Sequence, residues 1–223
     1  MTPRPRLAVL ASGRGSNLQC LLDAITCGQL DAEIVGVFSD KPQAQALAKV
    51  PSALRWSAKP ATFANREAFD CALADAVAAT QPDWVICAGY MRILGAAFVS
   101  RFSGQLVNIH PSLLPRHKGL HTHARALESG DSEHGASVHF VVAELDAGTV
   151  IAQAKVPVHT GDTADTLAAR VLEREHPLLL AVAQLLVSGR LAEQAGIVLL
   201  DGQPLFGPLL LDSHLTRLVP GST

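Results

Sequence analysis

The stretch that decides the fold is Gln105-Leu-Val-Asn108-Ile-His110-Pro-Ser-Leu-Leu-Pro115-Arg116. Residues 105–110 are typical of a buried strand, and Pro111 ends it because proline cannot donate to a sheet ladder. Asn108 and His110 are two residues apart, so both side chains leave the same face. They lie at the strand's C-terminal end, where open parallel sheets bind their ligands. An amide donor beside an imidazole can stabilise a developing oxyanion. The alternative is a buried histidine bonded to a loop carbonyl, beside a turn asparagine.

Outward from this strand, the first half of the chain alternates apolar strands with helices. The predicted strands are 6–11, 33–39, 54–57, 83–88 and 105–110, and the predicted helices are 16–27, 43–50, 65–80 (capped by Asn65) and 95–102. This alternation predicts an α/β fold, a Rossmann-like, mostly parallel twisted sheet with helices on both faces.

The second half has a different pattern. Strands are predicted at 137–142 and 149–158, followed by a helix over 163–188 that Pro177 should kink. Asp201-Gly202 is a hairpin signal, and residues 206–223 are expected to form a loose tail. Because no repeat or linker interrupts the sequence, we expect a single domain over residues 1–223.

Composition excludes several classes of protein. The chain has 223 residues, is 48% hydrophobic and has a formal charge of −2, so it can fill a core and lacks the basic surface of a nucleic-acid binder. The longest apolar run, near 178–187, is too short to span a bilayer. Residues 1–12 mimic a signal peptide but run directly into a glycine-rich turn, which favours a first core strand. Four cysteines without CxxC spacing indicate reduced thiols in a cytoplasmic protein.

A second candidate site is the loop Ser12-Gly13-Arg14-Gly15-Ser16-Asn17, between the first strand and the first helix. Glycines let the backbone approach an anion, and the free N–H groups of the helix start point at it. Leu18 stands where a dinucleotide fingerprint has its third glycine, so one phosphate, such as a phosphoribosyl group, fits better than a pyrophosphate. The alternative is a tight turn that only caps the helix.

Two further segments are candidates. Asp146 follows the strand 137–142, and a carboxylate next to His110 would raise the pKa of the imidazole and keep it cationic. Tyr90-Met91-Arg92-Ile93-Leu94 suits a flat heterocycle with an acidic tail. The alternatives are a turn-forming aspartate and a helix entering the core.

Metal and serine chemistry are disfavoured by the sequence. His121 and His123 form an HxH pair without the HExxH pattern of zinc enzymes, so we expect no metal. Ser137 lies in Gly-Ala-Ser-Val-His, which is not the GxSxG elbow of a hydrolase.

Taken together, these motifs resemble the 10-formyltetrahydrofolate-dependent formyltransferases, and among them the phosphoribosylglycinamide formyltransferases of purine synthesis. The motifs are Ser12-Gly-Arg-Gly-Ser-Asn17, Gly89-Tyr-Met-Arg-Ile-Leu94, Asn108-Ile-His-Pro-Ser-Leu-Leu-Pro115, Gly119-Leu-His-Thr-His123, Gly135-Ala-Ser-Val-His-Phe140 and Glu144-Leu-Asp146. They run in order from residue 7 to about residue 190, whereas residues 206–223 match nothing in the family.

The resemblance implies a role for each matching residue. Catalysis would rest on Asn108, His110 and Asp146. The phosphoribosylglycinamide would be bound by Gly15, Ser16, Asn17 and Glu175. The folate would be bound by Arg66, Met91, Arg92, Ile93, Leu94, Asn108, Val141 and Asp146, above an apolar floor of Phe98, Val99 and Leu106.

The activity that the resemblance implies is direct transfer of a formyl group from 10-formyltetrahydrofolate, as co-substrate, to the amine of the glycinamide, without metal. A protonated His110 and the Asn108 amide would hold the oxyanion. The partners would be small molecules only, with no nucleic acid and no membrane, and the enzyme would be a monomer or homodimer. The rivals are a 10-formyltetrahydrofolate hydrolase, another formyltransferase of the same fold such as one acting on Met-tRNA, and a non-catalytic phosphosugar-binding module.

Overall fold

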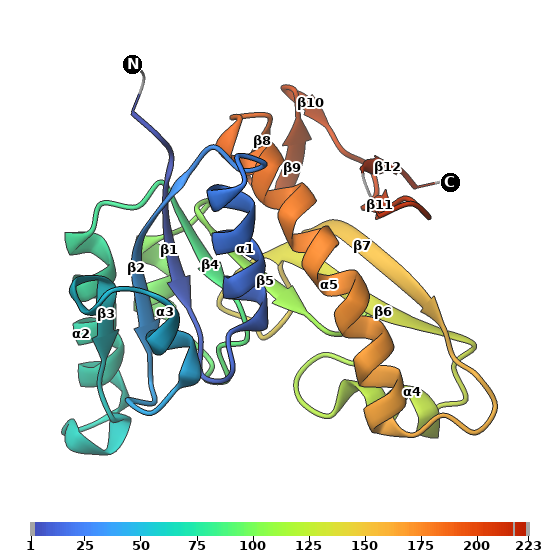
Figure 1. The fold of residues 1–223 in the computed structure, drawn as a ribbon, viewed down its shortest axis with the longest axis horizontal. Helices are drawn as coiled ribbons and strands as arrows, with labels where there is room; N and C mark the ends of the chain where they lie inside the picture. The colour runs from blue at the N-terminus through green and yellow to red at the C-terminus, as the bar shows by residue number, and fades with distance from the viewer. Residues whose placement is uncertain (1–2, 216, 222–223) are drawn as a thin grey trace. The chain divides into compact units, whose positions relative to one another are not determined.

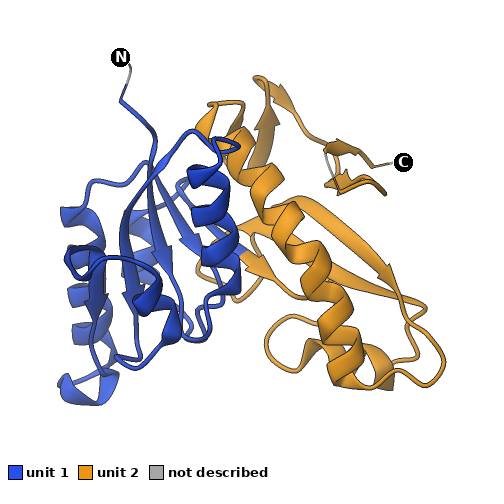
Figure 2. Cartoon of the chain, in the orientation of Figure 1, with its two compact units in different colours: residues 1–108 blue, residues 109–223 orange. Residues whose placement is uncertain are grey.

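The computed structural model describes residues 3–215 and 217–221 (Figure 1). The chain divides into two compact units, residues 1–108 and residues 109–223 (Figure 2), which we call unit 1 and unit 2. The expected single domain over residues 1–223 stays a prediction. None of the helices in the described ranges is both long enough and apolar enough to cross a membrane.

Unit 1 is built on a parallel sheet in the order β3-β2-β1-β4-β5. The strands are β1 (Arg6–Leu10), β2 (Glu33–Ser39), β3 (Arg55–Ser57), β4 (Trp84–Cys87) and β5 (Leu106–His110), the last of which carries the chain into unit 2. Residues 7–10 of β1 are fully buried, as the apolar central strand of a parallel sheet should be. The predicted α/β fold with a mostly parallel sheet is therefore confirmed.

The helices of unit 1 lie close to their predicted positions. They are α1 (Ser16–Thr26), α2 (Arg66–Ala79) and α3 (Ala96–Arg101), with 3-10 helices η1 (Gln45–Lys49), η2 (Ser52–Leu54) and η3 (Pro60–Thr62). Asn65 caps α2 as predicted, because its side chain accepts a hydrogen bond from Ala68 N at 2.8 Å. The helix predicted over 43–50 is a shorter 3-10 turn.

Unit 2 is built around an antiparallel pair of strands. The pair is β6 (Glu133–Phe140) with β7 (Val150–Pro157), and α5 (Ala164–Val187) packs along both strands and against α4 (Thr122–Glu128) (Figure 1). α5 is one helix with Pro177 inside it. A separate sheet contains β8 (Leu191–Gln194), β9 (Ile197–Leu200) and β10 (Gln203–Pro204). Asp201-Gly202 makes the predicted hairpin between β9 and β10, with both residues at positive φ.

The prediction of a loose tail over 206–223 is wrong for the described part of that segment. β11 (Leu209–Leu211) pairs in parallel with β7, and β12 (Leu218–Pro220) pairs antiparallel with β11. Leu209 is buried. A three-residue strand has too little periodicity to be recognised in the sequence, and its pairing depends on the free edge of β7.

Candidate active site

His110 lies buried at the C-terminal end of β5, two residues after Asn108, as the strand pattern predicts. Its Nε2 lies 3.1 Å from the carbonyl oxygen of His117. Because a carbonyl only accepts, Nε2 must carry the hydrogen, which leaves Nδ1 as the ring atom that can gain or lose a proton. The carbonyl of His110 accepts from Ser112 N at 2.9 Å, so the turn at Pro111 is closed by a backbone bond.

Asp146 approaches His110 as the sequence predicts. Its Oδ2 is 3.5 Å from His110 Nδ1 and accepts from Gly119 N at 2.8 Å. Asp146 lies in the loop between β6 and β7, and its backbone has a left-handed φ of 46°. Gly148 then packs on the Phe140 carbonyl, where an added Cβ would lie only 1.8 Å from the oxygen, so no side chain fits there.

His139 is a member of this cluster that the sequence reasoning missed. It is buried in β6, with Nε2 3.6 Å from Asp146 Oδ1 and Nδ1 2.7 Å from the carbonyl oxygen of Phe140. Asp146 therefore lies between two imidazoles. The available signal was the spacing in Ser137-Val-His139, which puts both polar side chains on one face of a strand.

The expectation that Asp146 keeps His110 cationic is wrong for the free protein. Burial lowers the pKa of His110 below its ordinary value, and this effect outweighs the carboxylate of Asp146, which raises it. Burial raises the pKa of Asp146, but the interactions with His139 and Gly119 N outweigh it and bring that pKa below its ordinary value. The pair at neutral pH is thus a carboxylate beside a neutral imidazole.

Ser137 and Gln153 hold the turn that follows His110. The hydroxyl of Ser137 donates to the Ser112 carbonyl at 2.7 Å and accepts from Leu114 N at 3.0 Å. Gln153 Nε2 donates to the Leu114 carbonyl at 2.8 Å and to Ser137 Oγ at 3.0 Å. The sequence reasoning dismissed Ser137 as a nucleophile, and its observed contacts are those of a scaffold.

The loop predicted to bind phosphate lies in unit 1. Gly15 has φ 72°, and a Cβ there would lie 2.7 Å from the Cβ of Ala46 in η1. α1 begins at Ser16, directly after this glycine, and has no acidic residue in its first turn. Asn17 is buried. Free N–H groups at a helix start, close to a glycine that admits no side chain, suit an anion.

The residues of unit 1 that are predicted to bind folate include polar and apolar side chains around 91–94. Arg66 donates to the Ile93 carbonyl at 2.7 Å and lies 3.6 Å from Asp70. The guanidinium of Arg92 lies over the ring of Phe69 at 5.2 Å. Met91 is 58% exposed and Ile93 is 50% exposed. The apolar side chains of Leu94, Phe98, Val99 and Leu106 are buried. Exposed apolar side chains beside an arginine fit the predicted flat heterocycle.

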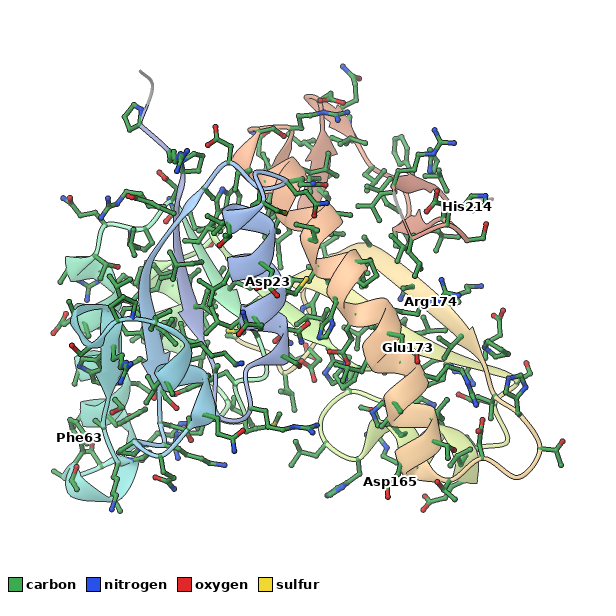
Figure 3. All side chains as sticks on the ribbon, in the orientation of Figure 1. Asp23, Phe63, Asp165, Glu173, Arg174 and His214 are labelled. Carbon is green, nitrogen blue, oxygen red and sulfur yellow. The ribbon has the colours of Figure 1, made fainter. Side chains whose placement is uncertain are left out.

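The other predicted residues lie in unit 2. Val141 follows β6 directly, and Glu175 lies on α5, next after Glu173 and Arg174, which Figure 3 labels. The predicted site residues therefore fall into two groups, 15–17, 66 and 91–94 in unit 1 and 110, 141, 146 and 175 in unit 2, with Asn108 the last residue of unit 1. The union of these groups in one site stays a prediction.

The two histidines considered for metal lie at the start of α4. His121 precedes the helix with a left-handed φ of 57°, and His123 Nδ1 lies 3.1 Å from His134 Nε2. Within residues 3–215 and 217–221, no group of three or more His, Cys, Asp or Glu is placed to hold a metal ion.

Comparison with known proteins gives consistent matches. The sequence model described as "Formyl transferase" matches residues 5–183, across both units. The chain is 47% identical to the phosphoribosylglycinamide formyltransferase of Escherichia coli K12 over 201 residues, which covers 89% of this chain and 95% of that protein. A solved phosphoribosylglycinamide formyltransferase from Coxiella burnetii is 39% identical with a TM-score of 0.85, over 96% of this chain and 98% of that one. A formyltetrahydrofolate deformylase from Pseudomonas syringae is 25% identical with a TM-score of 0.79, over 89% of this chain and 66% of that one.

Proposed function

Because the chain belongs to the formyl transferase family, we propose that it transfers a formyl group from 10-formyltetrahydrofolate to the amine of phosphoribosylglycinamide, in purine synthesis. The observation that carries this proposal is the position of Asp146 Oδ2, 3.5 Å from Nδ1 of the buried His110 at the end of β5. No covalent intermediate is needed. We expect the enzyme to act in the cytoplasm on small molecules alone, as a monomer or homodimer.

The substrate amine attacks the formyl carbon, and the carbonyl oxygen becomes an oxyanion. The Asn108 amide donates to this oxygen. Nδ1 of His110 takes the proton that the amine loses, and Asp146 stabilises the imidazolium that forms. The C–N bond to folate then breaks, and the proton passes from His110 to the folate nitrogen that carried the formyl group. His110 is thus a base first and an acid afterwards, which differs from a histidine that is cationic from the start.

Binding is divided between two kinds of surface. The N–H groups of Gly15, Ser16 and Asn17 bind the ribose phosphate, since a helix start favours a dianion. The exposed apolar side chains of Met91 and Ile93 contact the folate ring, with Arg66 near its glutamate tail. Val141 and Asp146 are the residues of unit 2 that we propose for folate binding, and Glu175 is the one that we propose for binding the glycinamide amine.

The test is an ultraviolet assay of folate product formation, with and without glycinamide ribonucleotide. We expect the absorbance change only when both substrates are present. A change with folate alone would instead support hydrolysis, the activity in the name of the Pseudomonas syringae relative. Binding of the ribonucleotide without any absorbance change would support a phosphosugar-binding module.

The role of Asn108 is tested separately. Asn108→Ala should lower turnover about a hundredfold to a thousandfold, because it removes one donor to the oxyanion. The thermal unfolding midpoint, measured on the same sample, is the control for folding. Turnover close to that of the native protein would contradict the assignment of Asn108.

A further inference from the structure

We propose that Ser12 and Asp40 are positioning residues that join the phosphate loop to the folate segment 89–94, so that the two substrates bind interdependently. This inference deepens the proposed function and rests on its assignment of the two loops. All of the contacts that carry it lie within unit 1.

Ser12 is the point where three segments of unit 1 meet. It is buried, and its hydroxyl donates to Asp40 Oδ1 at 2.5 Å. The hydroxyl oxygen of Ser12 also accepts a hydrogen bond from Met91 N at 2.9 Å, and Ser12 N donates to the Gly89 carbonyl at 3.0 Å. Ser12 thus binds the backbone on both sides of Tyr90, while the next residue along the chain, Gly13, begins the phosphate loop.

The contacts of Ser12 lie just beyond the C-terminal ends of β1, β2 and β4. Backbone bonds near this edge run from Ala11 N to the Phe38 carbonyl at 3.0 Å and from Ala88 N to the Leu10 carbonyl at 2.9 Å. Beyond them, Ser12 connects the loops that follow β1, β2 and β4, through its hydroxyl to Asp40 and Met91 and through its backbone N–H to Gly89.

Asp40 determines which way the Ser12 hydroxyl points. An ionised carboxylate can only accept, so the hydroxyl hydrogen must be directed at Asp40, which leaves the oxygen lone pairs free for Met91 N–H. Asp40 is buried, and among the described residues no lysine, arginine or histidine forms an ion pair with it. Burying a carboxylate without a cation is unfavourable for folding unless a hydrogen-bond donor satisfies it, and Ser12 supplies that donor.

Tyr90 lies in the segment that Ser12 binds. Burial, and then the nearby Asp40 carboxylate, raise the pKa of the Tyr90 phenol above its ordinary value. The side chain of Tyr90, in the segment between Gly89 and Met91, therefore stays neutral. With its backbone tied on both sides to Ser12, this segment moves with the phosphate loop.

The prediction is that phosphate bound in the loop reduces the local opening of the folate segment 89–94. Hydrogen exchange of the Met91 amide measures this directly, and inorganic phosphate is the probe. In the native chain, phosphate should slow exchange at Met91, and glycinamide ribonucleotide should lower the KM for folate. In Ser12→Ala the amide of Met91 loses its acceptor, so exchange should be fast and insensitive to phosphate, and KM for both substrates should rise about fivefold to twentyfold with a smaller change in kcat.

The chain offers matched controls. Ser39→Ala removes another buried serine hydroxyl, which accepts from Lys41 N at 3.1 Å at the end of β2, and it should change neither KM nor Met91 exchange. Asp40→Asn keeps an oxygen that accepts from Ser12 and should behave like the native chain, whereas Asp40→Ala should behave like Ser12→Ala. If Ser12→Ala does not fold, the two Asp40 variants decide the matter.

Three results would overturn the proposal. The first is that Ser12→Ala raises KM for only one of the two substrates. The second is that Ser39→Ala raises KM as much as Ser12→Ala does. The third is that phosphate leaves hydrogen exchange of the Met91 amide unchanged in the native chain. Failure of the proposed function is distinguishable, because a chain without transferase activity can still show phosphate-dependent protection of Met91.

Discussion

His110 and His139 contact opposite oxygens of one carboxylate, that of Asp146, at 3.5 and 3.6 Å. The other nitrogen of each ring faces a backbone carbonyl, that of His117 or that of Phe140. Since carbonyls only accept, those nitrogens carry hydrogens, and the nitrogens that face Asp146 are the ones free to exchange a proton. The carboxylate of Asp146 can therefore stabilise a proton on Nδ1 of His110, which is the property that a transient imidazolium at His110 requires.

Removal of the charge at position 146 should abolish this stabilisation. Asp146→Asn keeps an oxygen for Gly119 N but loses the negative charge, so we expect kcat/KM to fall about a hundredfold or more with little change in the unfolding midpoint. The matched control is Asp131→Asn, which alters a second His–Asp pair, with His117. Equal losses in both variants would mean that the effect is structural.

The pH dependence of kcat/KM should report the pKa of His110. That pKa lies below the ordinary value of 6.5, so the imidazole is neutral at pH 7 and becomes protonated only as pH falls. Because the neutral form is the base, kcat/KM should decline toward acid with a midpoint below 6.5. NMR titration of His110 should show the same midpoint, displaced to lower pH in Asp146→Asn. A midpoint above 6.5 would favour a histidine that is cationic from the start.

Acid should destabilise unit 2 through His134. Burial, followed by the neighbouring His123, lowers the pKa of His134 from 6.5 to about 4. The unfolded chain therefore binds more protons than the folded one between these values, so the free energy of unfolding falls as pH drops from 6.5 toward 4. The loss should be at most about 3.5 kcal/mol, at about 1.4 kcal/mol per pKa unit.

Urea unfolding at several pH values measures this slope. His134→Gln should flatten it, because the amide does not titrate and can still donate to His123. His214→Gln, at the exposed histidine labelled in Figure 3, should leave the slope unchanged. An unchanged slope in His134→Gln would assign the acid sensitivity to other groups.

Two glycines of the phosphate loop should respond differently to substitution. Gly15→Ala forces a side chain into a left-handed backbone and into Ala46, so we expect a loss of about 1–3 kcal/mol in stability and weaker binding of inorganic phosphate. At Gly13 an added Cβ meets nothing within 4 Å, and Gly13→Ala should bind phosphate almost as the native chain does. Isothermal titration with inorganic phosphate compares the two, and similar affinities would contradict the assignment of the loop.

The sequence was sufficient for the elements whose pattern is local. Apolar strands such as 33–39 and 105–110, the Asn65 cap and the Asp201-Gly202 turn were all predicted and are confirmed, because each follows from side chains a few residues apart. The formyl transferase family was likewise recognisable from short motifs, and the comparisons confirm it. The start of β6 at Glu133 and the strand β11 were missed, since both depend on pairing with β7.

By itself, the sequence determined the α/β alternation and the end of β5 at His110, whereas the pairing of this histidine with Asp146 was implied only by the family resemblance. Only the tertiary structure decided the charge of that histidine, the second imidazole on Asp146, and the hydroxyl of Ser12 between Asp40 and Met91. The physical reason is that periodicity and turn chemistry act over a few neighbouring residues. Desolvation of an imidazole and the meeting of three loops are set by chain segments that are far apart in sequence and become neighbours only in the folded protein.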